Sequence, residues 1–310
     1  MVVVLPIGNK PKFGINLALG SSCFVQCRGC YNHFGSTATR GGGLTASEIF
    51  RFVDRAKQVG LTKVTLSGGD PLTHPEIGAI VHGLRAMGMV VHLDTVGTAF
   101  LGRADLKFYG HGTVDAVPVG EIVSQVNRIG IPLDGHDQAT AELFRRGRPT
   151  LFEDTVNLIE QLREYPVEVC VNTVVHRNNI DSMGQLARVI TDLSPSIWQL
   201  FEFQATGPIA FRNKDAFQLA VGEFDEMAKR LPEWTKGSEV DVEAKSRATR
   251  REIYFMIDDS GLAWFPQTEG PDRIILGHIT RDAGAVIRLL DSHLNRPDLS
   301  SGDQPIDSVA

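Results

Sequence analysis

The stretch Cys23-Phe24-Val25-Gln26-Cys27-Arg28-Gly29-Cys30 governs how the rest of the chain is interpreted, because it brings three thiols within eight residues. The chain has 310 residues and 4 cysteines, so this Cys-x3-Cys-x2-Cys run holds all of them except Cys170. Cysteine thiolates are the usual ligands of iron–sulfur clusters. Three ligands on a cluster of four irons leave one iron open to a substrate or cofactor. Zinc is the rival metal, since His33 can supply the fourth ligand of a structural zinc site.

Composition is that of a soluble globular protein, with 42% hydrophobic residues and a net charge of −6 at pH 7. Lys and Arg are scattered without a basic stripe, which argues against a nucleic-acid partner. The apolar segment Met1 to Pro6 is too short for a signal peptide or a membrane span. If three cysteines bind metal, Cys170 has no disulfide partner in the chain. These features together predict a reducing, cytoplasmic location.

Hydrophobic periodicity alternates between strand and helix over the first two thirds of the chain. Short apolar strands are expected at residues 13–19, 63–66, 89–93, 128–133, 167–175 and 197–203. The helix after the first strand has a capping box at Thr45 and Glu48 and a terminating Gly60. This alternation predicts a parallel sheet. About six βα units fit a partial TIM-type barrel, an α/β fold of (β/α)6 form, better than a closed barrel of eight.

After Gly207 the alternation ends. Residues 215–231 are typical of helix, 252–258 and 262–265 of two strands joined by a hairpin turn, and 274–279 of an edge strand. We therefore expect a core barrel over residues 1–206 and a small C-terminal α+β lid over 207–290. Pro, Ser, Gly and Asp dominate from Asn295 onward, so residues 291–310 are predicted to be a disordered tail.

A second candidate site is the turn Ser67-Gly68-Gly69-Asp70-Pro71, which follows the strand 63–66. Barrel enzymes hold their sites at this carboxyl end of the strands. Glycines admit a ligand close to the backbone, and the Asp70 carboxylate can accept from an ammonium group. A tight turn without a ligand is the alternative.

The cysteine run followed by the glycine turn resembles the radical S-adenosylmethionine (radical SAM) superfamily. The resemblance implies that Cys23, Cys27 and Cys30 bind a 4Fe–4S cluster, that SAM chelates the fourth iron, and that the glycine turn holds the SAM amino group. Two positions depart from the family pattern. Gly29 stands where an aromatic residue usually precedes the third cysteine, and Asp70 stands where Glu is commoner.

The resemblance extends to the stretch Ile131-Pro132-Leu133-Asp134-Gly135, which is similar to the end of the family's fourth strand. It implies that Asp134 binds the ribose of SAM. An arginine in the following run Arg145-Arg146-Gly147-Arg148 would pair with the SAM carboxylate, and Arg146 is our candidate. The alternative is that these arginines form a solvated helix end.

The strand 167–175 permits an argument from alternation. Its odd-numbered positions are Val or Thr, whereas Cys170 and Asn172 share the other face. The more apolar face should pack on helices, so Cys170 and Asn172 should face the barrel lumen. By resemblance, Asn172 contacts SAM. Cys170 is a candidate hydrogen-atom donor to a substrate radical, and a small buried packing residue is the alternative.

With Cys170 alone remaining, the chain cannot ligate an auxiliary cluster, which favours redox-neutral chemistry. Residues 129–279 are similar to the viperin-like branch, whose members dehydrate nucleoside triphosphates. Those enzymes hold the phosphates with basic side chains on the fifth and sixth strands. Cys170, Ile197 and Gln199 occupy the matching positions here, and none is basic. We therefore expect a nucleoside or sugar substrate without a triphosphate.

Size and the lack of an auxiliary cluster most resemble the cytosylglucuronate decarboxylases, lyases of nucleoside antibiotic biosynthesis. The resemblance implies that the reduced cluster cleaves SAM to methionine and a 5′-deoxyadenosyl radical. That radical takes a hydrogen from the sugar ring before carbon dioxide leaves. An external electron donor of the flavodoxin or ferredoxin type is also implied. The alternatives are a sugar epimerase using Cys170, a viperin-like dehydratase, a peptide-modifying enzyme and a zinc-binding structural module.

Overall fold

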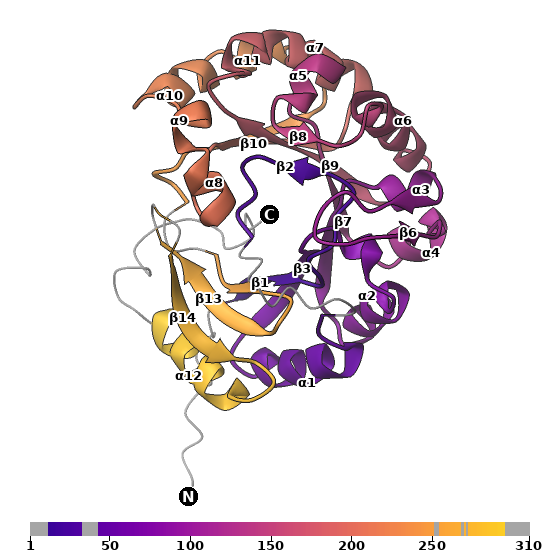
Figure 1. Cartoon of the computed structure of the whole chain (residues 1–310), viewed down its shortest axis with the longest axis vertical. Coiled ribbons are helices and arrows are strands. Elements are labelled where there is room, and N and C mark those ends of the chain that lie inside the picture. Colours follow the sequence, from indigo (N-terminus) through magenta and orange to yellow (C-terminus); the bar gives the residue numbers. More distant parts are fainter. Residues whose placement is uncertain (1–11, 33–42, 251–253, 268–269, 271, 295–310) are drawn as a thin grey trace, which may run out of the picture.

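The computed structural model is an arc of strands with helices on its outer side (Figure 1). It describes residues 12–32, 43–250, 254–267, 270 and 272–294. Six core strands pair in parallel with their neighbours. In spatial order they are β10 (Ile197–Glu202), β9 (Glu168–Val175), β7 (Arg128–Pro132), β4 (Val90–Asp94), β3 (Leu61–Ser67) and β1 (Phe13–Ala18). The expected α/β fold with a mainly parallel sheet is confirmed.

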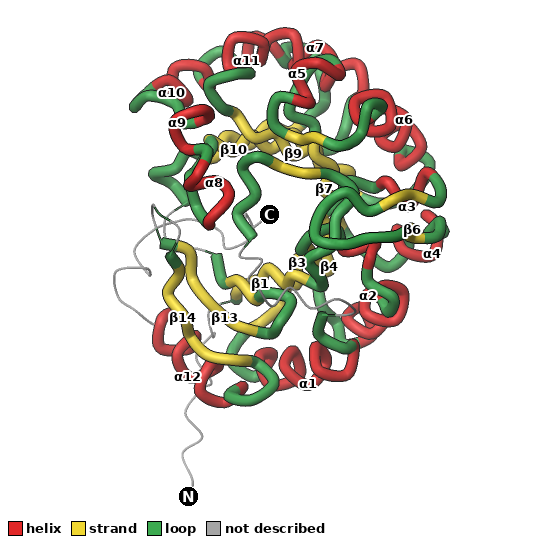
Figure 2. The backbone as a smooth tube through the Cα atoms, in the orientation of Figure 1, coloured by secondary structure: helices red, strands yellow, loops and turns green. Residues whose placement is uncertain are grey.

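Helices cover the outer face of this sheet, as the tube view also shows (Figure 2). The longer ones between strands are α1 (Ala46–Lys57), α2 (Ile77–Ala86), α6 (Leu151–Leu162) and α7 (Met183–Leu193). Helix α1 begins at the expected capping box, in which Thr45 and Glu48 each accept from the other's backbone N–H. Its buried face consists of Ala46, Ile49, Phe52, Val53 and Ala56. Helical spacing of apolar residues therefore fixes which side of α1 meets the sheet.

Shorter elements occupy the connections. The helical ones are η1 (Pro71–Thr73), α3 (Thr98–Leu101), α4 (Val119–Val123), α5 (Gln138–Glu142), η2 (Ile180–Ser182), α8 (Pro208–Arg212), α9 (Lys214–Phe217), α10 (Glu223–Ala228) and α11 (Leu231–Trp234). Two small antiparallel pairs are separate from the main sheet. One joins β5 (Ala104–Asp105) to β6 (Thr113–Val114), and the other joins β2 (Gln26–Cys27) to β8 (Arg145–Arg146). The helical structure expected over 215–231 is present as the short helices α9, α10 and the start of α11.

The segment after Gly207 extends the core sheet at both edges. β11 (Asp241–Lys245) pairs in parallel with β10, and β12 (Met256–Ile257) pairs in parallel with β1. β13 (Leu262–Pro266) and β14 (Arg273–His278) continue the second edge in antiparallel order. The sheet of the described residues thus has ten strands. The proposed domain boundary at residue 207 stays a prediction, because the sheet is continuous across it.

The last described element is helix α12 (Ala283–Leu294), which includes the first residues of the tail expected over 291–310. The rest of that tail, 295–310, lies outside the described residues. Among the helices that the structure describes, none is long and apolar enough to cross a bilayer.

The two faces of the sheet differ in chemistry. Residues that face the helices are apolar and fully buried, as Val64, Leu66, Val91 and Leu93 show. Their neighbours along the same strands face the lumen and are polar, among them Thr65, His92 and Asp94. A polar barrel interior therefore underlies the end of the barrel at which the chemistry-bearing loops meet.

Candidate active site

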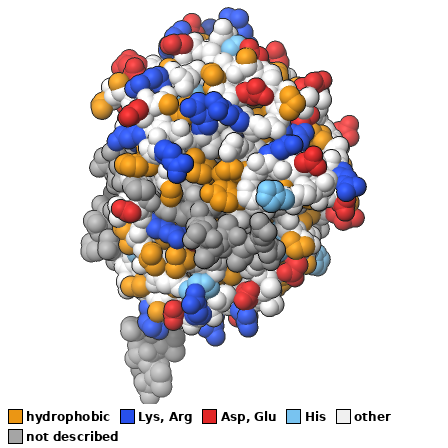
Figure 3. All heavy atoms as spheres, viewed as in Figure 1, with side chains coloured by type: hydrophobic (Ala, Val, Ile, Leu, Met, Phe, Trp, Pro, Cys, Tyr) orange, Lys and Arg blue, Asp and Glu red, His pale blue; other side chains and the backbone are white. Residues whose placement is uncertain are grey.

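A cavity of about 320 Å³ opens at the carboxyl ends of the core strands. Cys23, Cys27 and Cys30 line one part of it, together with the glycine turn at Gly68 and Gly69. Strand ends line the rest, including Asp94, Asn172 and Phe201. Hydrophobic side chains gather at the centre of the face shown in Figure 3, with Lys and Arg around them. The two predicted motifs are therefore brought to a single cavity.

The cysteine loop is held by backbone pairing with distant segments. The Cys23 N–H donates to the Phe108 carbonyl at 3.0 Å, and the Lys107 N–H donates to the Cys23 carbonyl at 2.9 Å. Strand β2 pairs with β8, which sets Cys27 opposite Arg145. Burial raises the pKa of all three thiols, that of Cys30 to about 12. Bound metal must therefore displace their protons, so cluster loading is coupled to proton release.

Arg145 lies between the cysteine loop and a buried carboxylate. Its Nε donates to Asp134 Oδ2 at 2.5 Å, and its Nη1 donates to Cys27 Sγ at 3.2 Å. Asp134 has a side chain that is 0% exposed and also accepts from the Val174 N–H at 2.7 Å. Arg146, our candidate for the cofactor, is exposed and does not line the cavity. Alternation along β8 turns Arg145 inward and Arg146 outward.

The glycine turn packs directly on the cysteine loop. A Cβ added at Gly69 would lie 2.1 Å from the Ser22 carbonyl oxygen, so only glycine fits this approach. The Asp70 carboxylate lies within the turn and accepts from the Leu72 and Val96 N–H groups and from the Thr95 hydroxyl. Ser67, Gly68 and Gly69 line the cavity, but Asp70 does not. Asp70 thus ties the turn to the loop after β4, and its contact with SAM stays a prediction.

Strand β9 has the orientation that alternation predicts. Asn172 lines the cavity, and its Nδ2 donates to Asp94 Oδ1 at 3.4 Å. Cys170 is 1% exposed and lies behind Asn172, with its Sγ 3.4 Å from Asn172 Oδ1. Cys170 is not part of the cavity wall, so Asn172 separates it from a ligand there. Its role as a hydrogen donor stays a prediction.

Residues 17–190, more than half of the chain, match the model of the radical SAM superfamily. This chain belongs to the radical SAM superfamily. Its cofactors are accordingly a 4Fe–4S cluster and SAM, and enzymes of this superfamily need a reductant. The described residues fit this pair of cofactors, because three thiols and a glycine turn face one cavity.

Named relatives of this radical SAM chain are all distant. It is 25% identical to the AdoMet-dependent heme synthase of Methanosarcina barkeri over 241 residues, 78% of this chain and 63% of the relative. It thus spans about three fifths of that heme synthase's length. It is 22% identical to the S-adenosylmethionine-dependent nucleotide dehydratase of Flammeovirga pacifica, over 82% of each chain. These relatives share the superfamily and do not establish a reaction.

Solved structures support the fold. The crystal structure of Streptococcus suis SuiB bound to S-adenosylmethionine matches with a TM-score of 0.66 at 12% identity, over 94% of this chain and 67% of that chain. At this identity the likeness is one of fold alone. The rival zinc site required His33, which lies outside the described residues. Within the described ranges, no three His, Cys, Asp or Glu side chains, those of Cys23, Cys27 and Cys30 included, converge on a single metal ion. The cluster assignment therefore rests on the family match and on the cavity that the three thiols share.

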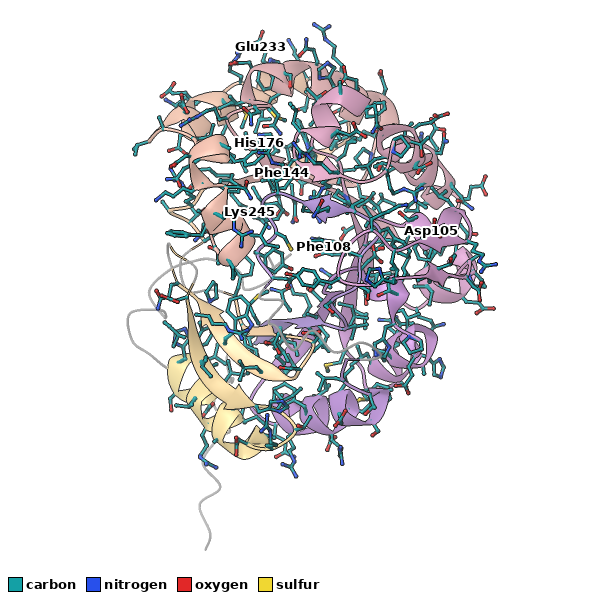
Figure 4. All side chains as sticks on the ribbon, viewed as in Figure 1. Asp105, Phe108, Phe144, His176, Glu233 and Lys245 are labelled. Carbon is teal, nitrogen blue, oxygen red and sulfur yellow. The ribbon has the colours of Figure 1, made fainter. Side chains whose placement is uncertain are left out.

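Gly29 stands where radical SAM enzymes usually carry an aromatic residue, and aromatic rings from elsewhere in the chain pack against it. A Cβ added at Gly29 would lie 2.3 Å from Phe144 Cζ and 2.8 Å from Phe203 Cε2. Phe144 lines the cavity and stacks on His176 with ring centroids 5.1 Å apart. Figure 4 labels both residues, which lie close together inside the ring of helices. Gly29 is therefore small because Phe144, over a hundred residues away in sequence, fills the space beside the loop.

Several residues that sequence reasoning did not select also line the cavity, among them Arg145, Asp94 and Arg250. The run of arginines pointed to the region of Arg145 but not to the residue. Asp94 ends a predicted strand, which is a position that barrel enzymes often use. Arg250 follows β11, a strand that the sequence analysis did not predict.

Proposed function

We propose that this radical SAM enzyme acts on a small sugar acid of the cytosylglucuronate kind and removes its carboxylate as carbon dioxide. The observation that carries the proposal is Arg250, a cation in the cavity wall. Its Nη2 donates to the Glu202 carbonyl, and its Nε donates to the Ser246 carbonyl at 3.4 Å. Both acceptors belong to the backbone, which leaves the charge of Arg250 for a ligand.

The neighbouring carboxylate does not neutralise Arg250 directly. Glu202 pairs with Arg247, whose Nε lies 2.7 Å from Glu202 Oε1. Among the described residues, Arg250 forms no ion pair of its own. Its guanidinium carbon lies 5.6 Å from the centre of the Phe201 ring. A carboxylate beside Arg250 would gain a charge-assisted and bidentate contact in a water-poor site.

The rest of the cavity wall offers aromatic surface for a planar base and polar atoms for the hydroxyl groups of a sugar. Phe108, Phe201, Tyr254 and Trp264 supply aromatic surface. Tyr254 Oη and Thr206 Oγ1 are buried and have no hydrogen-bond partner within the described residues. Buried polar atoms of this kind need a partner, and the hydroxyl groups of a sugar can provide one.

A triphosphate substrate, as the similarity to a nucleotide dehydratase suggests, fits the cavity less well. In the described part of its wall, the arginines and lysines are Arg145 and Arg250, and Arg145 is already paired with Asp134. Gln199 donates to Glu243 Oε2 at 2.8 Å and brings no positive charge. Triphosphates are bound by several cations acting together. A single available cation matches a single carboxylate better.

When bound and reduced, the cluster and SAM supply the radical that removes hydrogen from a substrate. The chain's own residues orient that substrate and exclude water. Arg250 holds the carboxylate, and the aromatic walls fix the plane of the base. Arg145 donates to a cluster thiolate and, through Asp134, fixes the loop after β7.

The test is anaerobic reconstitution with iron and sulfide, followed by dithionite, SAM and a panel of uronate nucleosides, neutral sugar nucleosides and nucleoside triphosphates. Mass spectrometry measures 5′-deoxyadenosine and the loss of carbon dioxide or water, and NMR detects epimers, whose mass is unchanged. We expect turnover of uronates only. Arg250→Gln should raise KM for the uronate at least tenfold, whereas Arg212→Gln, the same change at an exposed position on α8, should leave it unchanged.

Each of the following results would contradict part of the proposal. If a neutral sugar is inverted at one carbon, the enzyme is an epimerase and the decarboxylase proposal is wrong. If a nucleoside triphosphate loses water, the dehydratase reading replaces it. If Arg250→Gln turns over the uronate with unchanged KM, Arg250 does not bind the carboxylate.

A further inference from the structure

The carboxylate of Asp94 occupies a notch in the cavity wall, which is the space that Gly130 leaves because it has no side chain. In register, Asp94 on β4 is the partner of Gly130 on β7. A Cβ added at Gly130 would lie 2.1 Å from Asp94 Oδ1 and 2.6 Å from Asn172 Nδ2. The absence of a side chain at Gly130 therefore lets the Asp94 carboxylate reach across β7 to Asn172. All three residues line the cavity.

Asp94 is half-buried and is held more loosely than the buried carboxylates Asp70 and Asp134. Asp70 and Asp134 each accept short hydrogen bonds from backbone and side-chain donors. Asp94 accepts from Asn172 Nδ2 at 3.4 Å, a long contact. A carboxylate that faces a ligand cavity with spare acceptor capacity is available to the ligand.

We propose that Asp94 is a catalytic residue of this site, the carboxylate that takes a proton from a hydroxyl group of the substrate. The O–H bond of the substrate breaks and an O–H bond forms on Asp94. The electron pair stays on the substrate oxygen, so no oxidant or reductant is consumed in this step. The inference rests on the proposed function only for the choice of a hydroxyl-bearing substrate.

The surroundings of Asp94 bring its pKa close to the value that suits a general base. Burial raises the pKa of Asp94 to about 6, and nearby cations oppose part of that rise. The ionisable groups that act on it come from several elements: Lys63 on β3, Arg128 on β7, Cys170 on β9, Lys245 on β11, and Tyr31 and Tyr254 in the loops. A general base works best when its pKa lies near the working pH. Asp94 is therefore ionised at pH 7 and able to hold a proton transiently.

A polar lumen lies behind Asp94 and gives the proton a way out. His92 precedes Asp94 by two residues on the same strand face, and its register partners are Thr65 and Arg128. His92 Nδ1, Thr65 Oγ1 and Gln199 Oε1 are buried without a hydrogen-bond partner among the described residues. Such atoms are usually satisfied by internal water. This series of polar residues in the lumen ends at Glu168, which pairs with Arg128 and has a side chain 42% exposed to solvent.

Three variants of the reconstituted enzyme test the proposal. Asp94→Asn removes the base, and Gly130→Ala pushes the Asp94 carboxylate out of its notch. Asp181→Asn, at an exposed position on η2, is the matched control. Infrared difference spectra between pH 5 and pH 8 report any carboxylic acid that titrates. Product formation and the product formed per 5′-deoxyadenosine are measured with the uronate nucleoside panel.

We expect wild type to show carboxylic acid absorption that disappears above about pH 6, and Asp94→Asn to lack the part of it that belongs to Asp94. The part that belongs to Asp70, whose pKa burial also raises to about 6, should remain. Product formation should rise with pH through the same range. It should fall about 10²- to 10⁴-fold in Asp94→Asn, with less product per 5′-deoxyadenosine. Gly130→Ala should keep the band but lose product, and Asp181→Asn should match wild type.

Three results overturn the proposal. The first is an Asp94→Asn enzyme with product formation within a few fold of wild type. The second is an Asp94→Asn enzyme in which product and 5′-deoxyadenosine fall in proportion. The third is a wild-type spectrum without a titrating band that Asp94→Asn removes. If wild type turns over no panel member, the proposed substrate is wrong, and the infrared result alone decides for or against Asp94.

Discussion

Replacing Gly29 by Ala should disturb the cysteine loop by a clash that can be stated in ångströms. The new Cβ would lie 2.3 Å from Phe144 Cζ, 2.5 Å from Phe144 Cε2 and 2.8 Å from Phe203 Cε2. Ordinary carbon contacts are about 3.5–4.0 Å, so either the ring or the loop must move by about 1 Å. Phe144 cannot yield freely, because it is 2% exposed and packs against His176 and Phe217.

Forcing a methyl group into such a packed site costs about 1–3 kcal/mol of folding free energy. The displacement falls between Cys27 and Cys30, so we also expect fewer irons bound per chain. Thermal denaturation under anaerobic conditions measures the first effect. Iron and sulfide analysis, with the visible absorption of the cluster, measures the second.

The paired variant Gly29→Tyr/Phe144→Ala is the sharper test. It returns an aromatic side chain to the position before the third cysteine and removes the ring that blocks it. We expect the pair to bind more iron than Gly29→Tyr alone, with a coupling of about 0.5–3 kcal/mol in stability. Full iron content and unchanged melting in Gly29→Ala, or strictly additive effects in the pair, would refute the assignment of Phe144 to this space.

Three other outcomes are expected. Arg145→Gln leaves Asp134 buried without its cation, which should cost about 3–5 kcal/mol of folding free energy. It also removes a hydrogen-bond donor to Cys27, so the reduction potential of the cluster, measured by redox titration, should fall. An unchanged potential would mean that this contact is absent from the loaded protein. Because the pKa of Asp94 is raised in the folded state, its ionisation destabilises the fold as pH rises from about 4 to 6, by at most about 3 kcal/mol. The melting temperature of Asp94→Asn should therefore equal that of wild type at pH 4 and exceed it at pH 7. A constant difference in melting temperature across that range would contradict the raised pKa. Thr45→Ala removes a capping box from α1 and should cost about 1 kcal/mol in thermal or chemical denaturation without altering SAM cleavage.

The site is assembled from segments that lie far apart in the sequence. The cluster loop, the glycine turn and Asp70 form one hydrogen-bonded unit. Arg250 and the aromatic residues Phe201, Tyr254 and Trp264 come from the C-terminal half and line the same cavity, whereas Phe108 pairs with the cysteine loop. Under our proposal, the N-terminal unit holds the cofactors and the C-terminal residues select the substrate, and Asp94 lines the cavity that they share.

The sequence by itself determined the features that depend on local spacing. Three thiols within eight residues need no tertiary contact to be recognised as a ligand set. Strand and helix periods gave the core strands, and alternation along 168–175 correctly set Asn172 toward the lumen. These patterns persist because backbone geometry fixes them over a few residues.

Tertiary structure decided everything that depends on which distant residues meet. Pairing of β2 with β8 selected Arg145 rather than Arg146, and no spacing in the chain distinguishes two adjacent arginines. Strand β11 escaped prediction because its charged residues are stabilised by pairing with β10 and by ion pairs such as Glu243 with Lys245. Gly29 is small only because Phe144 folds against it, since packing is set by shape across the fold and not by the residue's neighbours in sequence.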